Sequence, residues 1–320
     1  MSNDIRTAHE ADGTAAARRA RHGRIGHTQS KVFSILSVLS LLIGLVIIGA
    51  PFVMRAVNEH RQTAVISRSE HTVAAWPYPK AEDELKAARA YNRKLAASGQ
   101  NVIGEVHDPF TSDTGRSTTS DVDASLAEQD TTYQHLLDTG QGVMGTIRIP
   151  SIAVNLPIYH GTGEDALAAG AGHLYGTSLP VGGKGTHAVI TGHRGLPNAL
   201  LFTRLDELKT GDAFYIDVMG EELAYQVDRI DVITPDDSSK LRIRKGEDRV
   251  TLMTCTPYGV NSHRLLVSGV RASVPDDVPA ADDVHGVNTT TLVLALLGVV
   301  VAVLLALAAW WVLRRRGRHG

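Results

Sequence analysis

The sequence predicts a mostly β domain between two membrane-spanning helices. From Val143 onward, seven short runs of β-forming residues alternate with turn residues, and two long uncharged stretches lie near the ends of the chain. The runs cover residues 146–149, 152–158, 187–191, 213–218, 223–233, 249–255 and 265–271. Seven or eight short strands at this spacing are typical of a β-barrel or a β-sandwich, and the pattern alone does not choose between them.

Helical patterns precede and interrupt the strands. Residues 80–98 place apolar side chains three or four positions apart, which predicts an amphipathic helix lying on the domain. These side chains are Ala81, Leu85, Ala88, Tyr91 and Leu95. Short helices are also expected at Tyr133, Leu136 and Leu137 and over 164–171 and 198–208. Residues 111–125 hold almost nothing to bury and predict a long loop, either a lid or a linker.

The two uncharged stretches, residues 32–54 and 291–313, are each 23 residues long. About 20 apolar residues are needed to cross a bilayer as a helix, so both are predicted to span the membrane. A secretory signal peptide is the competing interpretation of the first stretch, but its apolar core is only about 7–15 residues long. No clean small-x-small cleavage site follows Met54, so we favour an uncleaved anchor.

Basic residues flank both spans on the side away from the β domain. They are Arg18, Arg19, Arg21, Arg24 and Lys31 before the first, and Arg314, Arg315, Arg316 and Arg318 after the second, where Trp310 and Trp311 close the apolar run. By the positive-inside rule, both termini are cytoplasmic, the chain passes twice through the membrane lipid, and residues 55 to about 290 lie outside the cell. The first basic tail shows hardly any apolar periodicity and is expected to be disordered.

Composition excludes several classes of function. The formal net charge is −2 and only 5% of residues are aromatic, so neither a basic nucleic-acid-binding face nor a base-stacking platform is expected. The chain contains no nucleotide-binding loop, no HExxH motif and no Cys/His spacing suited to a metal. We therefore predict no cofactor and no metal site.

One cysteine, one histidine and one arginine form the candidate site. Cys255 is the only cysteine, so it cannot form an intramolecular disulfide, and it ends a strand-like run. Arg264 opens the next apolar run, and His193 ends an earlier one between two glycines. A buried, inert cysteine is the alternative, but the placement of Cys255 with these distant partners favours a nucleophile.

These three side chains suit acyl transfer. A thiolate is a strong nucleophile, and the His193 imidazolium stabilises it and then protonates the departing amine. The Arg264 guanidinium offers several fixed donors to the oxyanion formed when a peptide carbonyl is attacked. The resulting thioester reacts with water or with an amine, and the residues alone do not decide between a protease and a ligase.

Neighbouring polar residues are interpreted as structural. The hydroxyls of Thr251 and Thr254 are expected to pack and form local hydrogen bonds. If the strand alternation extends as far as Arg194, that residue faces away from His193. The other histidines near these segments are also interpreted as structural, since most histidines near a site are. They are His160, His173, His187 and His263.

The run Thr-Leu-Met-Thr-Cys ending at Cys255, with Arg264 downstream and Thr-Gly-His ending at His193 upstream, resembles the sortase transpeptidases. The resemblance extends from about Gly145 to Arg271, through Leu-Pro-Ile-Tyr-His-Gly-Thr at 156–162 and Gly-His-Leu-Tyr-Gly-Thr-Ser-Leu-Pro at 172–180. The two membrane-like ends, and Asp108-Pro109-Phe110, are similar to the pilin-polymerising class C sortases of Gram-positive bacteria.

This resemblance implies a closed eight-stranded sortase-type barrel with Cys255, His193 and Arg264 as catalytic residues. It also implies that Asp108, Pro109 and Phe110 form a lid, with Asp108 near the arginine and Phe110 over the cysteine. The implied reaction is cleavage of an LPxTG-like sorting signal between Thr and Gly, followed by transfer to a lysine of the next pilin subunit. Two alternatives stay open: a housekeeping sortase that attaches proteins to peptidoglycan, and a non-catalytic β-domain that binds surface partners.

The predicted organisation has seven parts. These are a basic cytoplasmic tail (1–31), a transmembrane helix (32–54), an extracellular helical region with the lid (55–140, lid 108–110), the sortase barrel (141–275), a linker (276–290), a second transmembrane helix (291–313) and a second basic tail (314–320).

Overall fold

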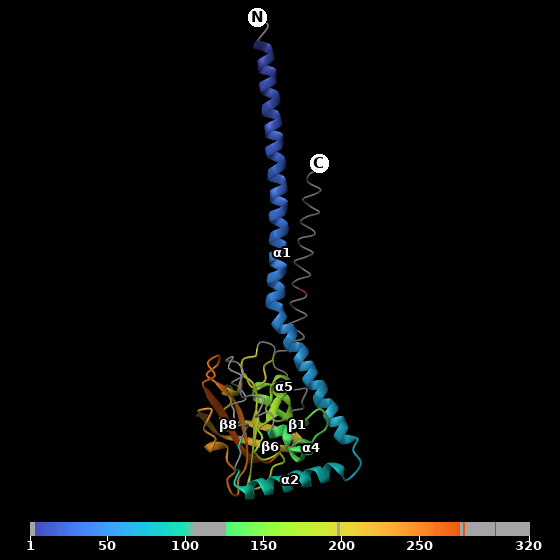
Figure 1. Ribbon diagram of the computed structural model, residues 1–320, viewed down its shortest axis with the longest axis vertical. Coiled ribbons are helices and arrows are strands. Elements are labelled where there is room, and N and C mark those ends of the chain that lie inside the picture. Colours follow the sequence, from blue (N-terminus) through green and yellow to red (C-terminus); the bar gives the residue numbers. More distant parts are fainter. Residues whose placement is uncertain are drawn as a thin grey trace. The chain divides into compact units, whose positions relative to one another are not determined.

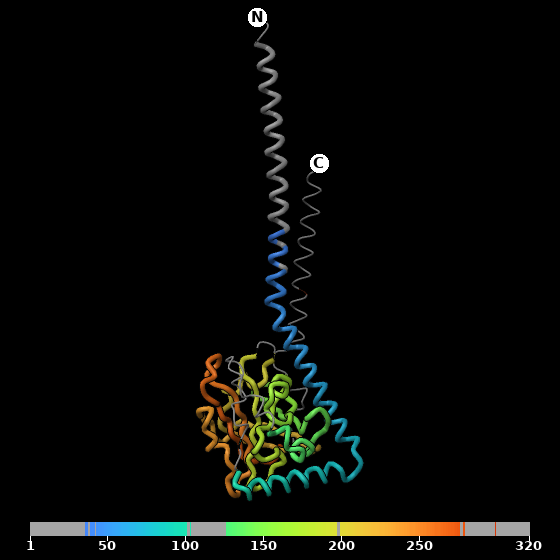
Figure 2. Tube along the Cα trace, in the orientation of Figure 1, coloured from blue at the N-terminus to red at the C-terminus, as the bar shows by residue number. Residues whose placement is uncertain are grey.

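The computed structural model describes residues 4–100, 103, 126–196, 199–275, 278 and 298, with side chains described from Leu36 onward except at Val38 and Leu42. Contacts divide the chain into two units, of which Val53–Leu292 contains the β domain. Figure 2 follows the chain in colour, so that the barrel can be traced from green at its start to orange at its end. The predicted lid, linker, second transmembrane helix and C-terminal tail lie outside the described residues, apart from the isolated positions 278 and 298.

Eight strands close into a single barrel, which confirms the predicted mostly β fold (Figure 1). The order around the barrel is β1-β2-β3-β4-β7-β8-β6-β5. The strands are β1 Val143–Ile149, β2 Val154–His160, β3 Ala171–His173, β4 Thr186–Thr191, β5 Ala213–Val218, β6 Glu221–Ile233, β7 Asp248–Thr256 and β8 His263–Ala272. Seven of them overlap the predicted runs; β3 was not predicted because its three residues are too few to display an alternating pattern.

The pairing of β4, β7 and β8 brings three strand ends to one rim of the barrel. β4 runs parallel to β7, with Thr191 opposite Met253, and β8 runs antiparallel to β7 on its other side, with Arg264 opposite Cys255. In this arrangement the carboxyl ends of β4 and β7 lie beside the amino end of β8. The sequence motifs therefore meet because of backbone pairing.

Apolar side chains from the strands fill the barrel interior. Fully buried residues include Ile147, Ile158, Ile190, Phe214, Ile216, Leu252 and Val267. Packing is close enough to require glycine at position 269, because a Cβ there would lie 2.7 Å from the ring of Phe214. Methylene-sized changes in such an interior are destabilising, so the barrel is a rigid support for its rim.

Helix α2 (Lys80–Ser98) has the predicted bounds and lies along the lower end of the barrel in Figure 1. It buries Leu85 and Ala88 against the domain. The buried amide of Asn92 donates to the carbonyl of Leu179 (2.9 Å) and accepts from the Leu179 N–H (2.8 Å). These two bonds satisfy backbone groups that burial would otherwise leave unpaired, and they fix the helix to the barrel.

The short helices agree with the prediction in two places and differ in one. Helices α4 (Thr131–His135) and α5 (Glu164–Ala169) lie within or beside the predicted segments. The helix predicted over 198–208 is wrong, because its described residues form turns and one short 3-10 helix, η3 (Leu205–Glu207). Leu201 has φ 39°, which a continuous right-handed helix does not allow, and the N–H of Thr203 bonds to the carbonyl of Leu200.

Helix α1 (Asp4–Ala74) is longer than the predicted transmembrane helix at both ends. The basic tail that was expected to be disordered is helical from Asp4, which agrees with its many alanines and arginines, both strong helix formers. Among the described residues, α1 is the one helix long and apolar enough to cross a membrane, over Leu39–Ala74.

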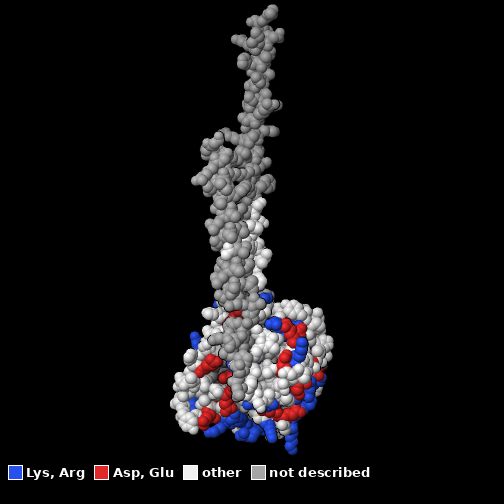
Figure 3. Space-filling model, turned by 180° about the vertical axis from the view of Figure 1, so that it is seen from behind, with Lys and Arg blue, Asp and Glu red and all other residues white. Residues whose placement is uncertain are grey.

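Residues 36–54 of α1 present an apolar surface, unlike the unit that holds the barrel. Residues 36–54 carry no charge, and large apolar side chains there are exposed, such as Val46 at 70%. The unit that holds the barrel instead carries many acidic and basic side chains, as Figure 3 shows from behind. An exposed apolar helix of this kind is suited to a lipid environment.

Candidate active site

Cys255 lies in β7, one residue before its end, with Arg264 of β8 as its Cα partner in the antiparallel ladder. Only 2% of the cysteine is exposed, and it packs against Leu167 of α5. Burial raises the pKa of the thiol to about 12, and the positive charge of Arg194 opposes that rise. In this buried conformation Cys255 is therefore a neutral thiol at neutral pH, which differs from the thiolate expected from the sequence.

His193 follows the end of β4 and is held beside the same part of β7. The Gly192 N–H donates to the carbonyl of Met253 (3.0 Å), and the hydroxyl of Thr254 donates to the carbonyl of Gly192 (2.7 Å). A Cβ at Gly192 would lie 2.7 Å from the ring of Phe202, so only glycine fits beneath that ring. These contacts place the backbone of His193 next to the segment that carries Cys255.

Arg264 is 3% exposed, and burial lowers its pKa to about 10, so the guanidinium keeps its charge at neutral pH. Its Nη1 donates to the carbonyls of Asn261 (3.0 Å) and His263 (2.9 Å), which fix one edge of the guanidinium. A buried cation at the level of Cys255 is suited to binding a developing oxyanion.

Comparison with known proteins agrees with this geometry. A family model described as a sortase domain matches residues 147–272. The solved structure of sortase C1 of GBS pilus island 1 is 40% identical, with a TM-score of 0.57 over 68% of this chain and 96% of its own. Sortase C of Streptococcus pneumoniae is 42% identical, with a TM-score of 0.55 over 68% of this chain and all of its own. Sortase A of Bacillus anthracis is 27% identical over 75% of this chain and 95% of its own length.

The chain belongs to the sortase family. It is a cysteine transpeptidase, and the structural neighbours are class C sortases, which confirms the resemblance stated from the sequence. The predicted lid residues Asp108, Pro109 and Phe110 lie outside the described part of this sortase.

Two residues near the cysteine were missed by the sequence analysis. Leu167 covers the thiol from α5, and Arg194 reaches the hydroxyl of Thr256 (3.3 Å), next to Cys255. Strand alternation was expected to turn Arg194 away from His193, but β4 ends at Thr191, so the alternation does not extend to Arg194. The glycine at 195, with φ 86°, is the signal that could have indicated a change of direction here.

Two of the other histidines of this sortase are buried and bonded within the fold, as expected of structural residues. His173 lies 2.8 Å from the carbonyl of Ser178 through Nε2 and 2.9 Å from the hydroxyl of Tyr133 through Nδ1. Burial lowers the pKa of His173 to about 4. His160 lies between the carbonyls of Leu136 and Gly142, at 2.8 and 2.9 Å.

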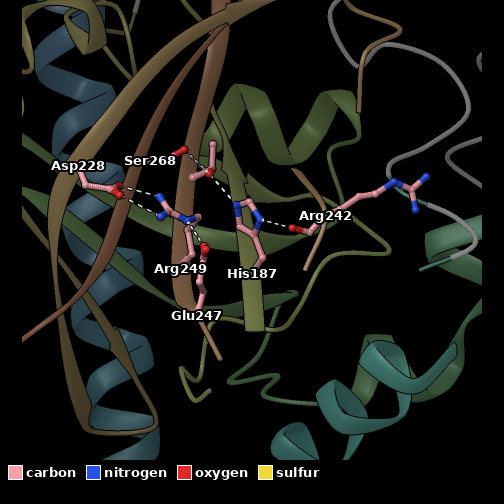
Figure 4. Close-up of polar contacts among 7 residues, drawn as sticks. His187, Asp228, Arg242, Glu247, Arg249 and Ser268 are labelled. Atoms are coloured by element: carbon pink, nitrogen blue, oxygen red, sulfur yellow. Dashed lines mark hydrogen bonds and ion pairs between the residues drawn. The ribbon is translucent and has the colours of Figure 1, made fainter. Parts of the chain in front are cut away.

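His187 belongs to a separate polar network that links β4, β7 and β8 (Figure 4). Its Nδ1 donates to the carbonyl of Arg242 (3.1 Å), and its Nε2 accepts from the hydroxyl of Thr251 (2.7 Å), which in turn contacts Ser268 (2.7 Å). In the neutral ring the proton lies on Nδ1, because the carbonyl oxygen of Arg242 can only accept. Burial and then the charge of Arg249 lower the pKa of His187 to about 4, although the Arg242 bond opposes this.

A second set of bonds, beside this network, fully pairs an arginine of β7 (Figure 4). Arg249 forms two bonds with Asp228 (2.6 and 2.9 Å) and one with Glu247 (3.0 Å). The two sets of bonds together hold the first half of β7 in place. A separate cavity of about 240 Å³ lies between α1, β1 and β5, and none of its lining residues belongs to β4, β7 or β8.

Thr251 and Thr254 form local hydrogen bonds, as predicted. The described residues include no group of three His, Cys, Asp or Glu side chains placed to hold a metal ion.

The His187 network predicts loss of stability in acid. The pKa of an unfolded histidine is about 6.5 and that of folded His187 is about 4, so the unfolded state binds a proton first as pH falls. This single residue should cost about 2 kcal/mol of folding free energy at pH 5 relative to pH 8. Melting temperatures of the full chain in detergent should therefore fall less in the His187→Gln variant than in the original protein over this range.

The His263→Gln variant is the matched control for this measurement, because it removes an exposed histidine in place of a buried one. An equal drop in melting temperature for the original protein and the His187→Gln variant would show that His187 titrates normally.

Proposed function

We propose that this sortase cleaves an LPxTG-like sorting signal between Thr and Gly and joins the new Thr carboxyl group to a lysine of a pilin subunit. Cys255 is the proposed nucleophile, because the enzyme is a cysteine transpeptidase and the chain has a single cysteine. The observation that carries the proposal is the pairing of Cys255 with Arg264, beside the segment that holds His193.

In the first half-reaction, the Cys255 thiol transfers its proton to the His193 imidazole as Sγ attacks the Thr carbonyl carbon. Negative charge develops on the carbonyl oxygen, and Arg264 stabilises it by donating hydrogen bonds. The C–N bond to Gly then breaks, and the His193 imidazolium protonates the leaving amine. The products are a thioester on Cys255 and a peptide with a free amino terminus.

In the second half-reaction, a neutral lysine amine attacks the thioester carbonyl. Arg264 again stabilises the oxyanion, His193 removes a proton from the attacking nitrogen, and that proton returns to the sulfur as the C–S bond breaks. The outcome is an isopeptide bond and a regenerated thiol. The choice of a pilin lysine is supported by the class C neighbours, because the sortase C of Streptococcus pneumoniae has pilin substrates.

The proposed location is the cell membrane, with the barrel outside the cell and both termini in the cytoplasm. The exposed apolar surface of α1 supports the first membrane span. The uncharged run 291–313 and the basic residues beyond both spans support the second span and the orientation. A tethered enzyme facing outward is placed beside the surface proteins that it would join.

We also propose that Asp108, Pro109 and Phe110 form a lid over the thiol, with Asp108 as a counter-ion of Arg264. The burial of Cys255 supports a covered resting state, in which the raised thiol pKa keeps the nucleophile inactive. Covering a reactive thiol outside the cell protects it from oxidation and prevents wasteful hydrolysis of substrate.

The proposed chemistry predicts an acyl adduct on Cys255. The full chain in detergent, incubated with a sorting-signal peptide, should gain the mass of the fragment ending in Thr, and the Cys255→Ala variant should gain none. Arg264→Met should lower the rate of adduct formation about 10²- to 10³-fold, the usual loss for one oxyanion donor. Arg271→Met, at the other end of β8, is the matched control and should keep the original rate.

No adduct on Cys255, or an Arg264→Met variant as fast as the control, would contradict the assignment. The product separates the two sortase alternatives. Covalent ladders of high mass that resist boiling in detergent indicate pilin joining, and a single wall-linked species indicates attachment to peptidoglycan.

The lid proposal predicts faster labelling of Cys255 when the lid is weakened. Replacing Asp108 and Phe110 together by Ala should raise the rate at which a small thiol reagent labels the protein, because the thiol becomes hydrated and its pKa falls. The rate is followed by mass spectrometry on the full chain, with the Cys255→Ala variant as the blank. An unchanged rate would remove the lid from the account.

A further inference from the structure

We propose that Arg194 is a positioning residue of this sortase, which supplies positive charge beside Cys255 from a position fixed by its contacts with the turn after β7 and with η3. This inference deepens the proposed function and rests on its assignment of Cys255 as the nucleophile. Arg194 acts through Cys255, whereas Arg264 is proposed to contact the substrate oxygen.

The guanidinium of Arg194 connects three segments. Its Nη1 donates to the hydroxyl of Thr256 (3.3 Å) at the end of β7, and its Nη2 pairs with Asp206 (2.5 Å) of η3. Its Cζ lies 5.8 Å from the ring centroid of Tyr258 in the turn before β8. Arg194 thus holds together the residues that directly follow His193 and Cys255 in the chain.

The backbone beside Arg194 is built for this contact. Gly195 has φ 86°, a left-handed conformation that side chains rarely adopt, and a Cβ there would lie 3.2 Å from the ring of Tyr258. The glycine lets the chain change direction after β4 while the tyrosine packs closely against it. This change of direction brings the Arg194 side chain to the end of β7.

The charge of Arg194 acts in a poorly solvated place. Its side chain is 8% exposed, whereas that of Asp206 is 48% exposed, so water screens the carboxylate more than the guanidinium. The field of Arg194 also lowers the pKa of the Cys255 thiol against the effect of burial. Its buried Nε donates to no acceptor in the described part of the chain, unlike the fully paired Arg249.

The rate of Cys255 alkylation tests the proposal, because the chain has a single cysteine. The full chain in detergent is treated with iodoacetamide at several pH values between 6 and 9, and labelling is followed by mass spectrometry. Arg194→Met should slow labelling about tenfold at each pH, which corresponds to a rise of one unit in the thiol pKa. Arg194→Lys keeps the charge and should stay within about threefold of the original rate.

The direction of the change in labelling rate distinguishes an effect of the Arg194 charge on Cys255 from a merely structural role of Arg194. If Arg194 only stabilised the turn, its loss would loosen the residues around Cys255 and speed labelling. Arg204→Met is the matched control, because Arg204 pairs with Glu207 in the same region, and its rate should be unchanged. An Arg194→Met variant that labels as fast as the original protein, or faster, would overturn the proposal.

A second variant keeps the test decisive if Arg194→Met fails to fold. Asp206→Asn removes the counter-charge and leaves the guanidinium held by Thr256 and Tyr258, so labelling should become about threefold faster. Unchanged or slower labelling would overturn the proposal. Alkylation needs no peptide substrate, so this outcome is independent of whether an acyl adduct forms on Cys255.

Discussion

The structure depends on the position of β7 between a parallel neighbour and an antiparallel one. Because β4 runs beside β7 in the same direction, the residues after its end reach the level of Cys255. Because β8 runs in the opposite direction, its second residue, Arg264, lies opposite the same cysteine. Backbone hydrogen bonds thus bring together segments that are distant in the sequence. His193 lies 62 positions before Cys255, and Arg264 lies 9 positions after it. The side chains at the rim need the rigidity of the closed barrel below them to keep this arrangement.

Burial and reactivity oppose each other at this rim. A thiol that is 2% exposed is protected from oxidation, but its pKa of about 12 leaves very little thiolate at neutral pH. The positive charge of Arg194 partly counters the effect of burial on the thiol pKa. Arg264 keeps its own charge, because its pKa, although lowered by burial, stays near 10. This balance is consistent with the proposed covered resting state of the enzyme.

The sequence predicted those features that depend on local patterns. The bounds of α2 and β5 follow from the spacing of apolar residues, and the meeting of Cys255 with Arg264 follows from two adjacent apolar runs. The strand β3 was missed because three residues are too few to show an alternating pattern. The segment 198–208 was assigned as a helix because its apolar spacing gives no sign of the backbone turn at Leu201. The closed barrel itself came from the family resemblance, since alternation alone fits a sandwich equally well.

Features that depend on tertiary packing were beyond such patterns. The contact of Arg194 with Thr256 needs the chain to turn at Gly195, and the contact of Leu167 with Cys255 joins α5 to a strand far along the chain. The lowered pKa of His187 likewise arises from burial and from partners on other segments. Apart from Gly195, the local sequence gives no sign of these interactions, which change the pKa values of Cys255 and His187.

In the proposed reaction, Cys255, His193 and Arg264 surround one peptide group. The most direct measurement is a crystal structure of the chain with Cys255 covalently joined to a sorting-signal mimic that ends in a Thr carbonyl. We expect an Arg264 nitrogen about 3 Å from the carbonyl oxygen, with the His193 ring facing the position of the departing amine. A carbonyl oxygen directed to solvent, with Arg264 and His193 both out of reach, would contradict this expectation.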